Sequence, residues 1–192
     1  MSSSVELLDN ARALRQQGEY QKALDVYRQV MELDNSNLDA LNEMGLVHIL
    51  IGEQTFAINA FDLAICIDPS DPRAYSHKAE AFLTLSQFQD ALATAEQGLA
   101  EAPEDPDLWA KKARALESVM RIDDAIEAYN ESIKYDSENP KTWKALALCL
   151  DAQEKWSEVA RAYRIAGALH EKRGEAQDAE SCYKFAEFAE KS

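Results

Sequence analysis

The side chains that most often carry out chemistry are scattered along this sequence. Its three histidines, His48, His77 and His170, lie far apart, and no group of His, Asp and Glu has the close spacing of metal ligands. The sequence also contains no glycine-rich phosphate loop and no GxSxG motif. These absences predict a protein that is not an enzyme and that holds no metal and no cofactor.

The three cysteines give no sign of a disulfide framework or of a zinc site. Cys66, Cys149 and Cys182 are odd in number, lie far apart and include no CxxC pair. Disulfide frameworks need paired cysteines, and structural zinc sites need clustered ones. We therefore expect all three to be small residues of the core. We also expect His48 to be a core histidine whose hydrogen bonds are satisfied within the protein.

The elements that must position these residues are helices, and the pattern is clearest over residues 106–139. Apolar residues in the first half recur at the spacing of one buried helix face. Asp105 suits the N-cap of this helix and Pro106 its first turn. A second stripe follows after a short link, so the two helices should form an antiparallel pair. Ala113 and Ala125 are expected where the two helices cross closely.

The same pattern returns every 34 residues. Small residues recur at the crossing positions, and Asp-Pro or Asn-Pro pairs mark three helix starts at this interval. The order of large, small, aromatic, small and proline residues resembles the tetratricopeptide repeat, whose unit is 34 residues long. The resemblance covers nearly the whole chain, in the repeat units 4–37, 38–71, 72–105, 106–139 and 140–173.

The resemblance implies an all-α fold. It predicts a right-handed α-solenoid of stacked antiparallel helix pairs, with five repeat units and a C-terminal capping helix, or about eleven helices in a single domain over 1–192. The helix from about Ser157 to Lys172 has no Pro stop, and the sequence after it resembles the second helix of a further unit. We therefore expect this long helix to serve two hairpins. The polar outward face of the last helix, about 175–191, should solvate the end of the stack.

Charge and hydropathy narrow the possible partners. The formal net charge is −15, and the second and third repeat units are the most acidic. Such a surface should repel nucleic acid and anionic membranes and attract basic protein segments, and the alternative is a solvated acidic surface without a binding role. The N-terminal residues lack the pattern of a signal peptide, and no apolar stretch is long enough to span a membrane. We therefore expect a cytoplasmic protein.

The first helices of stacked units line a concave groove, and their outward residues are free to contact a partner. The second unit carries Leu46, Ile49 and Leu50 there, an apolar group that its own hairpin does not need for packing. The alternative is that neighbouring units or the backbone cover these three side chains. The binding residues predicted in this way are Arg12, Asn42, Glu43, Leu46, Ile49, Leu50, Arg73, His77, Glu80, Leu83, Lys111 and Arg114.

The best-known ligand mode of the resembled family is a clamp of Lys, Asn and Arg that holds the C-terminal carboxylates of heat-shock chaperones. On this chain the clamp positions would be Leu8, Arg12, Glu43, Arg73 and His77. Only Arg73 keeps a matching character, and Glu43 would repel a carboxylate. We therefore do not expect chaperone tails as ligands.

The expected function is a non-catalytic scaffold for protein–protein interaction that binds a peptide or helix of a partner in its groove. The ligand should be apolar and carry basic residues, because acidic residues such as Glu43 and Glu80 flank the apolar group. Two alternatives remain. The chain could assemble with copies of itself through its last helix or a convex face, or it could be the substrate-recruiting repeat region of a larger enzyme.

Overall fold

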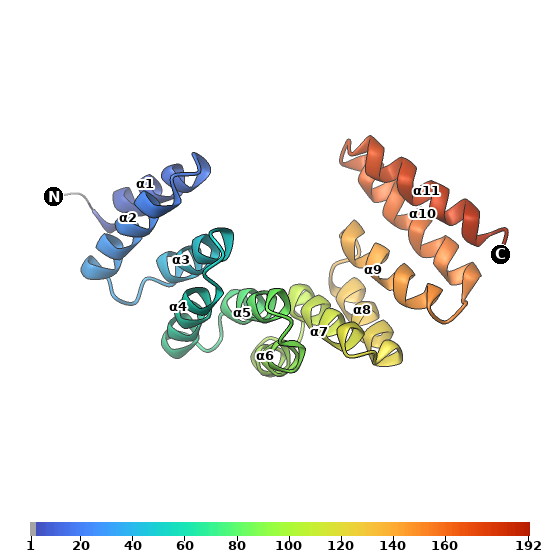
Figure 1. Cartoon of the computed structure of the whole chain (residues 1–192), viewed down its shortest axis with the longest axis horizontal. Helices are drawn as coiled ribbons and strands as arrows, with labels where there is room; N and C mark the ends of the chain where they lie inside the picture. The colour runs from blue at the N-terminus through green and yellow to red at the C-terminus, as the bar shows by residue number, and fades with distance from the viewer. Residues whose placement is uncertain (1–2) are drawn as a thin grey trace. The chain divides into compact units, whose positions relative to one another are not determined.

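The computed structural model describes residues 3–192, and these form eleven α-helices and contain no strand (Figure 1). The all-α class and the expected number of helices are therefore confirmed. In chain order the helices are α1 (Ser4–Gln16), α2 (Tyr20–Leu33), α3 (Leu38–Leu50), α4 (Gln54–Ile67), α5 (Pro72–Thr84), α6 (Phe88–Glu101), α7 (Pro106–Ser118), α8 (Ile122–Tyr135), α9 (Pro140–Asp151), α10 (Trp156–Lys172) and α11 (Ala176–Ala189).

The chain divides into two compact bodies. The N-terminal body, Met1–Ala102, contains α1 to α6, and the C-terminal body, Pro103–Ser192, contains α7 to α11. Within each body consecutive helices pack as hairpins, and each hairpin packs on the next through α2 with α3, α4 with α5, or α8 with α9. This packing of consecutive helix pairs is that of an α-solenoid. Among the helices of the described chain, none is both long and apolar enough to cross a membrane.

The first helices of the five repeat units, α1, α3, α5, α7 and α9, each begin at a side-chain cap. The Glu6 amide donates to Ser3 Oγ at 3.2 Å while the Ser3 amide donates to Glu6 Oε2 at 3.0 Å, which together form a capping box. Asp105 Oδ1 likewise accepts from the Leu108 amide at 2.8 Å, as expected. These local hydrogen bonds satisfy backbone groups that have no partner inside the helix.

The second helices begin after tight turns. Three of these turns contain a glycine with positive φ, namely Gly18, Gly52 and Gly174. A residue without Cβ adopts this conformation at little cost, which explains glycine at these positions. The equivalent turns at Ser86, Met120 and Glu154 adopt the same left-handed conformation with non-glycine residues. Their local strain is offset by the packing of the hairpins that they connect.

Small residues lie where the paired helices cross. Ala113 and Ala125 are fully buried, as expected. At Gly45 no larger residue fits, because a Cβ atom there would overlap the ring of Phe61. The buried crossing positions therefore fix the distance between the two helices of a hairpin.

The long helix α10 serves two hairpins, as the sequence predicted. It packs against both α9 and α11. A Cβ atom on Gly167 of α10 would overlap the ring of Tyr183 on α11, which reproduces the fit of Gly45 to Phe61 at the same separation of 16 residues. The pair of α10 and α11 is therefore a sixth hairpin that shares one helix with the fifth.

The description of α11 as a polar cap needs correction. Phe185 and Phe188 on this helix are 56% and 68% exposed. Both side chains lie next to the buried stripe of α11 and line a hollow that residues of α9 also line. The outward surface of α11 therefore includes large apolar groups as well as charged ones.

The expectation for the cysteines holds for two of the three. Cys149 and Cys182 are buried, and burial raises the pKa of the Cys149 thiol to about 12, which keeps it protonated at neutral pH. The expectation is wrong for Cys66, which is exposed on α4. Phe56 on the same helix is also 59% exposed. Phe56 precedes the first buried residue of α4, Ala57, and Cys66 follows the last one, Ala64, so both lie at the ends of the buried stripe.

Two tryptophans tie the start of their helices to the preceding loop. The indole N–H of Trp109 donates to the Pro103 carbonyl at 2.8 Å, and that of Trp143 donates to the Ser137 carbonyl at 2.9 Å. The two tryptophans lie 34 residues apart, at the same position of the fourth and fifth repeat units. A tryptophan at this position therefore also fixes the connection between hairpins.

Candidate functional site

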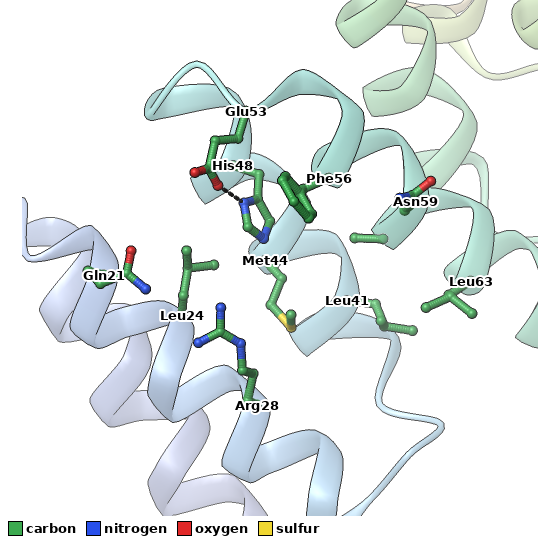
Figure 2. Close-up of a pocket in the computed structure, with 11 residues that line it drawn as sticks. Gln21, Leu24, Arg28, Leu41, Met44, His48, Glu53, Phe56, Asn59 and Leu63 are labelled. Carbon is green, nitrogen blue, oxygen red and sulfur yellow. Dashed lines mark hydrogen bonds and ion pairs between the residues drawn. The ribbon is translucent and has the colours of Figure 1, made fainter.

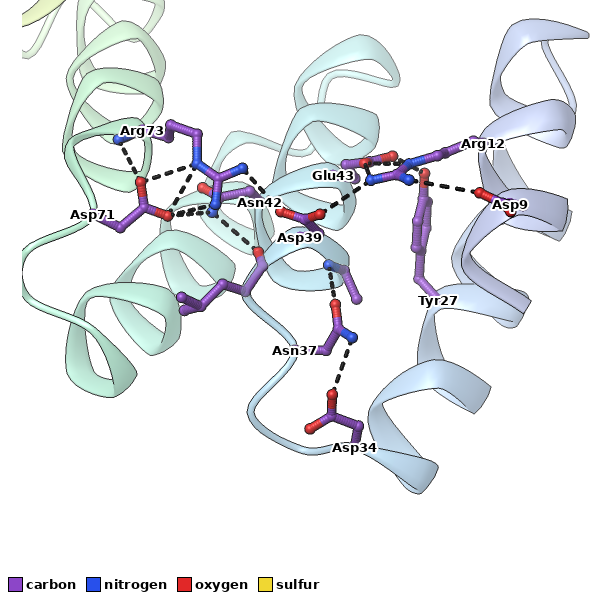
Figure 3. A network of polar contacts seen from close by, with 12 residues as sticks. Asp9, Arg12, Tyr27, Asp34, Asn37, Asp39, Asn42, Glu43, Asp71 and Arg73 are labelled. Atoms are coloured by element: carbon purple, nitrogen blue, oxygen red, sulfur yellow. Dashed lines mark hydrogen bonds and ion pairs between the residues drawn. The ribbon is translucent and has the colours of Figure 1, made fainter. Parts of the chain in front are cut away.

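A pocket of about 220 Å³ lies among the first helices of the three hairpins of the N-terminal body. Figure 3 shows the network of polar contacts that connects side chains of these helices. We call this pocket the arginine pocket. Its walls come from α1, α3 and α5, and it is lined by Arg12, Arg15, Asp39, Asn42, Glu43, Leu46, Arg73 and His77. The structure thus brings together six of the twelve predicted binding residues, Arg12, Asn42, Glu43, Leu46, Arg73 and His77.

Asp39 lies between two arginines of this pocket. Arg12 Nη2 from α1 donates to its Oδ2 at 3.2 Å, and Arg73 Nη1 from α5 donates to its Oδ1 at 2.9 Å. The hydrogen bond from Arg73 is the main reason why the pKa of Asp39 lies below its usual value, and Arg12 lowers it further. Arg73 also contacts Asp71, the N-cap of its own helix, at 2.9 Å. One carboxylate therefore connects three hairpins.

Glu43 is neutralised inside the pocket, although the sequence suggested that it would offer negative charge to a ligand. Arg12 Nε donates to Glu43 Oε1 at 2.7 Å, and the Tyr27 hydroxyl donates to Oε2 at 2.7 Å. Burial, reinforced by this carboxylate, raises the pKa of Tyr27. Arg15 lies 3.8 Å from the same carboxylate. The charges of the pocket are therefore paired with one another.

Asn42 is the most deeply buried polar residue of the pocket, at 3% exposure. Its Nδ2 donates to the Leu38 carbonyl at 3.0 Å and lies 3.4 Å from Asp71 Oδ2. Its Oδ1 is also buried, yet it accepts no hydrogen bond from any residue that the structure describes. A buried acceptor without a donor costs about 1–3 kcal/mol, so a ligand N–H that reached this atom would recover that free energy.

The other predicted residues differ in how open they are. Leu50, at the end of α3, is 58% exposed, whereas Leu83 on α5 is only 8% exposed and is not open to a ligand. Ile49 and Glu80 are half-buried on α3 and α5. The remaining two, Lys111 and Arg114, lie on α7 of the C-terminal body.

A second hollow, of about 430 Å³, lies between α2, α3 and α4 and was not predicted (Figure 2). Leu24, Leu41 and Met44 lie among its lining residues, and Phe56 and Leu63 of α4 are 59% and 56% exposed at its side. The seven-residue spacing of these two apolar side chains is the signal in the sequence that could have identified this surface.

Two histidines each contact a glutamate across the turn of their hairpin, at equivalent positions. His48 Nδ1 lies 2.8 Å from Glu53 Oε2, and His170 Nδ1 lies 2.5 Å from Glu175 Oε2. His48 is buried, which confirms its place in the core, and Phe56 stacks on its ring. Because both pairs occupy the same place in their hairpins, we interpret them as structural contacts.

The structure also brings together one group that the sequence spacing did not reveal. The ligand atoms of His170, Glu175 and Asp178 lie within 4.8 Å of one another. Both carboxylates are exposed, Lys144 lies 4.0 Å from Asp178, and His170 is engaged with Glu175. The cationic neighbour opposes the binding of a second cation, so this group fits the hairpin contact better than a metal centre.

Comparisons with known proteins agree with the repeat pattern. A family model described as TPR repeat matches residues 11–52, and one described as Tetratricopeptide repeat matches residues 57–115, together more than half of the chain. A relative among curated proteins, Protein SGT1 homolog from Oryza sativa subsp. japonica, is 28% identical over 97 residues. The match covers 50% of this chain and 26% of that protein, so the chain spans about a quarter of its length.

Solved structures share the arrangement of helices. TTC0263, described as a thermophilic TPR protein in Thermus thermophilus, is 16% identical with a TM-score of 0.77, covering 97% of this chain and 100% of its own. MamA 41-end from Desulfovibrio magneticus RS-1 is 20% identical with a TM-score of 0.72, covering 90% and 98%. YrrB, described as a TPR protein with an unusual peptide-binding site, is 16% identical with a TM-score of 0.63, covering 93% and 92%. At these identities the likeness concerns the fold.

Proposed function

The chain belongs to the tetratricopeptide repeat proteins, and from this premise we propose that it is a scaffold whose arginine pocket binds a peptide segment of a partner protein. The repeat fold is generally that of a non-catalytic scaffold for protein interaction. One structural neighbour, YrrB, is described as having a peptide-binding site. The proposal for this chain rests on its own residues.

The observation that carries the proposal is the buried, unpaired Oδ1 of Asn42. A peptide backbone presents N–H donors at regular intervals, and one of them would satisfy this acceptor once the Asn42 side chain turned its oxygen toward the pocket. Leu46 lines the pocket beside it, and Ile49 and Leu50 continue along α3. A ligand that places a backbone N–H on Asn42 and an apolar side chain on these residues would fit both features.

The charges of the pocket should affect the ligand indirectly. Arg12, Arg73, Asp39 and Glu43 already bind one another, so none of them needs a ligand charge for neutralisation. The whole chain carries a formal charge of −15, which favours a basic segment during approach. We therefore expect basic residues in the ligand to raise the association rate more than the final affinity.

The test is affinity capture from a native lysate, quantified by mass spectrometry, with the wild-type chain and three full-length variants. Leu46→Ser/Leu50→Ser removes the apolar surface, and Asn42→Leu removes the unpaired acceptor. Leu33→Ser is a matched control, because Leu33 is 61% exposed and lies on α2, outside the lining of the pocket. We expect both pocket variants to lose the same captured proteins that the wild type and the control retain.

Thermal melting of each variant separates binding from folding. If the pocket variants melt like the wild type and still capture the same proteins, the ligand binds elsewhere and the proposal is wrong. If Leu46→Ser/Leu50→Ser melts far below the wild type, these residues are part of the core, and the apolar contribution to binding must be abandoned.

A further inference from the structure

A third hollow, of about 420 Å³, lies in the C-terminal body and contains none of the twelve binding residues named above. We call it the α9–α11 groove. Its volume falls within the range of about 300–1,000 Å³ that is typical of ligand sites. It is lined by Leu148 and Asp151 of α9, Val159 and Tyr163 of α10, and Lys184, Phe185, Phe188 and Ala189 of α11.

The groove exists because two hairpins share α10. Both α9 and α11 pack against this one helix, so the strip of α10 between them is covered from the sides but not from above. Val159 and Tyr163 of this strip are only 2% and 6% exposed. The ring of Phe185 stacks on that of Tyr163, with centroids 5.2 Å apart. The floor is therefore closed and apolar.

The sides of the groove expose large apolar side chains. Leu148 is 55% exposed on α9, and Phe185 and Phe188 are 56% and 68% exposed on α11. Single exposed apolar residues are common on protein surfaces, but three around one hollow form a patch. A helix that only solvated the end of a repeat stack would carry polar side chains here.

The unmatched charge at the rim is negative. Asp151 is the last residue of α9, where the helix dipole already places negative partial charge. Among the ion pairs of the described residues, none involves the Asp151 carboxylate. The other charged residue of the rim, Lys184, pairs with Glu180 at 2.6 Å. A cation on an incoming ligand would therefore find its partner at Asp151.

We propose that the α9–α11 groove binds an amphipathic helix of a partner protein, which inserts apolar side chains between Leu148, Phe185 and Phe188 and places Lys or Arg against Asp151. A hollow that lies between two helices, with a third helix as its floor, has the shape to accommodate a helix. The apolar side chains of that helix would recur about one turn apart. A second copy of this chain is a poorer occupant, because two chains of net charge −15 repel each other. This site is independent of the arginine pocket.

The test is a selection from a phage library of random peptides of about 16 residues, or four to five helical turns. The library is first depleted on full-length Phe185→Ser/Phe188→Ser and then selected on the wild-type chain. Depletion removes peptides that bind other surfaces, including the arginine pocket. We expect the enriched peptides to carry Leu, Ile or Phe at helical spacing together with Lys or Arg.

Fluorescence anisotropy with the enriched peptides then measures how much the Asp151 carboxylate and the apolar side chain of Phe188 each contribute to the affinity. Asp151→Lys should weaken binding by about tenfold or more, and Phe188→Ser by at least as much. Phe56→Ser is the matched control, since Phe56 is 59% exposed on α4 of the N-terminal body. This control should bind the peptides like the wild type.

Three results would overturn the proposal. Depletion could leave no enriched peptide, or the enriched peptides could lack basic residues and bind Asp151→Lys unchanged. Sedimentation could instead show that the wild type self-associates and Phe185→Ser/Phe188→Ser does not, which would make a second copy the occupant. If that double variant fails to fold, Leu148→Lys replaces it in the depletion step, because Leu148 is exposed on a different helix.

Discussion

Asp39 connects three helices of the N-terminal body through one carboxylate. Arg12 and Arg73 reach it from α1 and α5, and its side chain is 43% exposed. A contact this exposed is screened by solvent, so its contribution to stability is modest, about 0.2–1 kcal/mol. Its importance is geometric, because it fixes both arginines beside the unpaired acceptor of Asn42.

The lowered pKa of Asp39 gives this contact a defined pH dependence. The pKa of a free Asp is about 3.9, so the stabilisation is complete above that pH and is lost as the pH falls through the lower folded value. We expect Asp39→Asn to melt below the wild type at neutral pH. The difference should disappear in strong acid, which thermal melting over a pH series would reveal. A difference that stays constant with pH would show that the carboxylate charge is not involved.

Gly45 offers a second residue-scale test. A Cβ atom there would overlap the ring of Phe61, so we expect Gly45→Ala to lower the free energy of unfolding by about 1–3 kcal/mol. Phe61→Leu should relieve part of this overlap, and the double variant should lose less than the sum of the two single changes. Urea denaturation would measure the free energy of unfolding of the two single variants and the double variant. A neutral Gly45→Ala would mean that the two helices separate more easily than their packing indicates.

Residues such as these were only partly predictable. The small residue at each crossing follows from the 34-residue period, because every hairpin needs a close approach at the same place. The pairing of Glu43 with Arg12 and Tyr27 was not predictable, since it depends on rotamers of side chains from three helices. For that reason the sequence suggested a free acidic group where the structure has a neutralised one.

At the scale of elements, the starts of the helices were the most predictable feature. Caps and Pro in the first turn are local signals, and Asp105 caps its helix as expected. The exposure of Phe56, Phe185 and Phe188 was not predictable in the same way. Each lies at the edge of a buried stripe, where the position of the next helix decides whether the side chain is covered.

The shared helix α10 predicts that α11 is a structural part of its body. Removing residues after Gly174 would expose the side of α10 that carries Ala166, Gly167 and His170, all of which are buried. We expect the melting temperature of the C-terminal body to fall by at least about 10 °C, since 1 kcal/mol corresponds to about 4–8 °C in a body of this size. Calorimetry of the full and the shortened chain would measure this fall in melting temperature. An unchanged melting temperature would mean that α11 is dispensable.

At the scale of the whole molecule, the division into two bodies suggests two partly independent folding units. The N-terminal body contains three hairpins, which is the number that a repeat array needs to bury a continuous core. We expect residues 1–102 expressed alone to be helical and to melt cooperatively, as measured by circular dichroism. A gradual loss of helicity without a transition would show that this body does not fold by itself.

The division also has a spectroscopic consequence. The chain has three tryptophans, Trp109, Trp143 and Trp156, and all of them belong to the C-terminal body. The indole groups of Trp109 and Trp143 bind loop carbonyls that unfolding would release to water. Emission excited at the red edge of indole absorption therefore originates from one body, whereas ellipticity sums over both. Intrinsic tryptophan fluorescence therefore reports the unfolding of the C-terminal body alone.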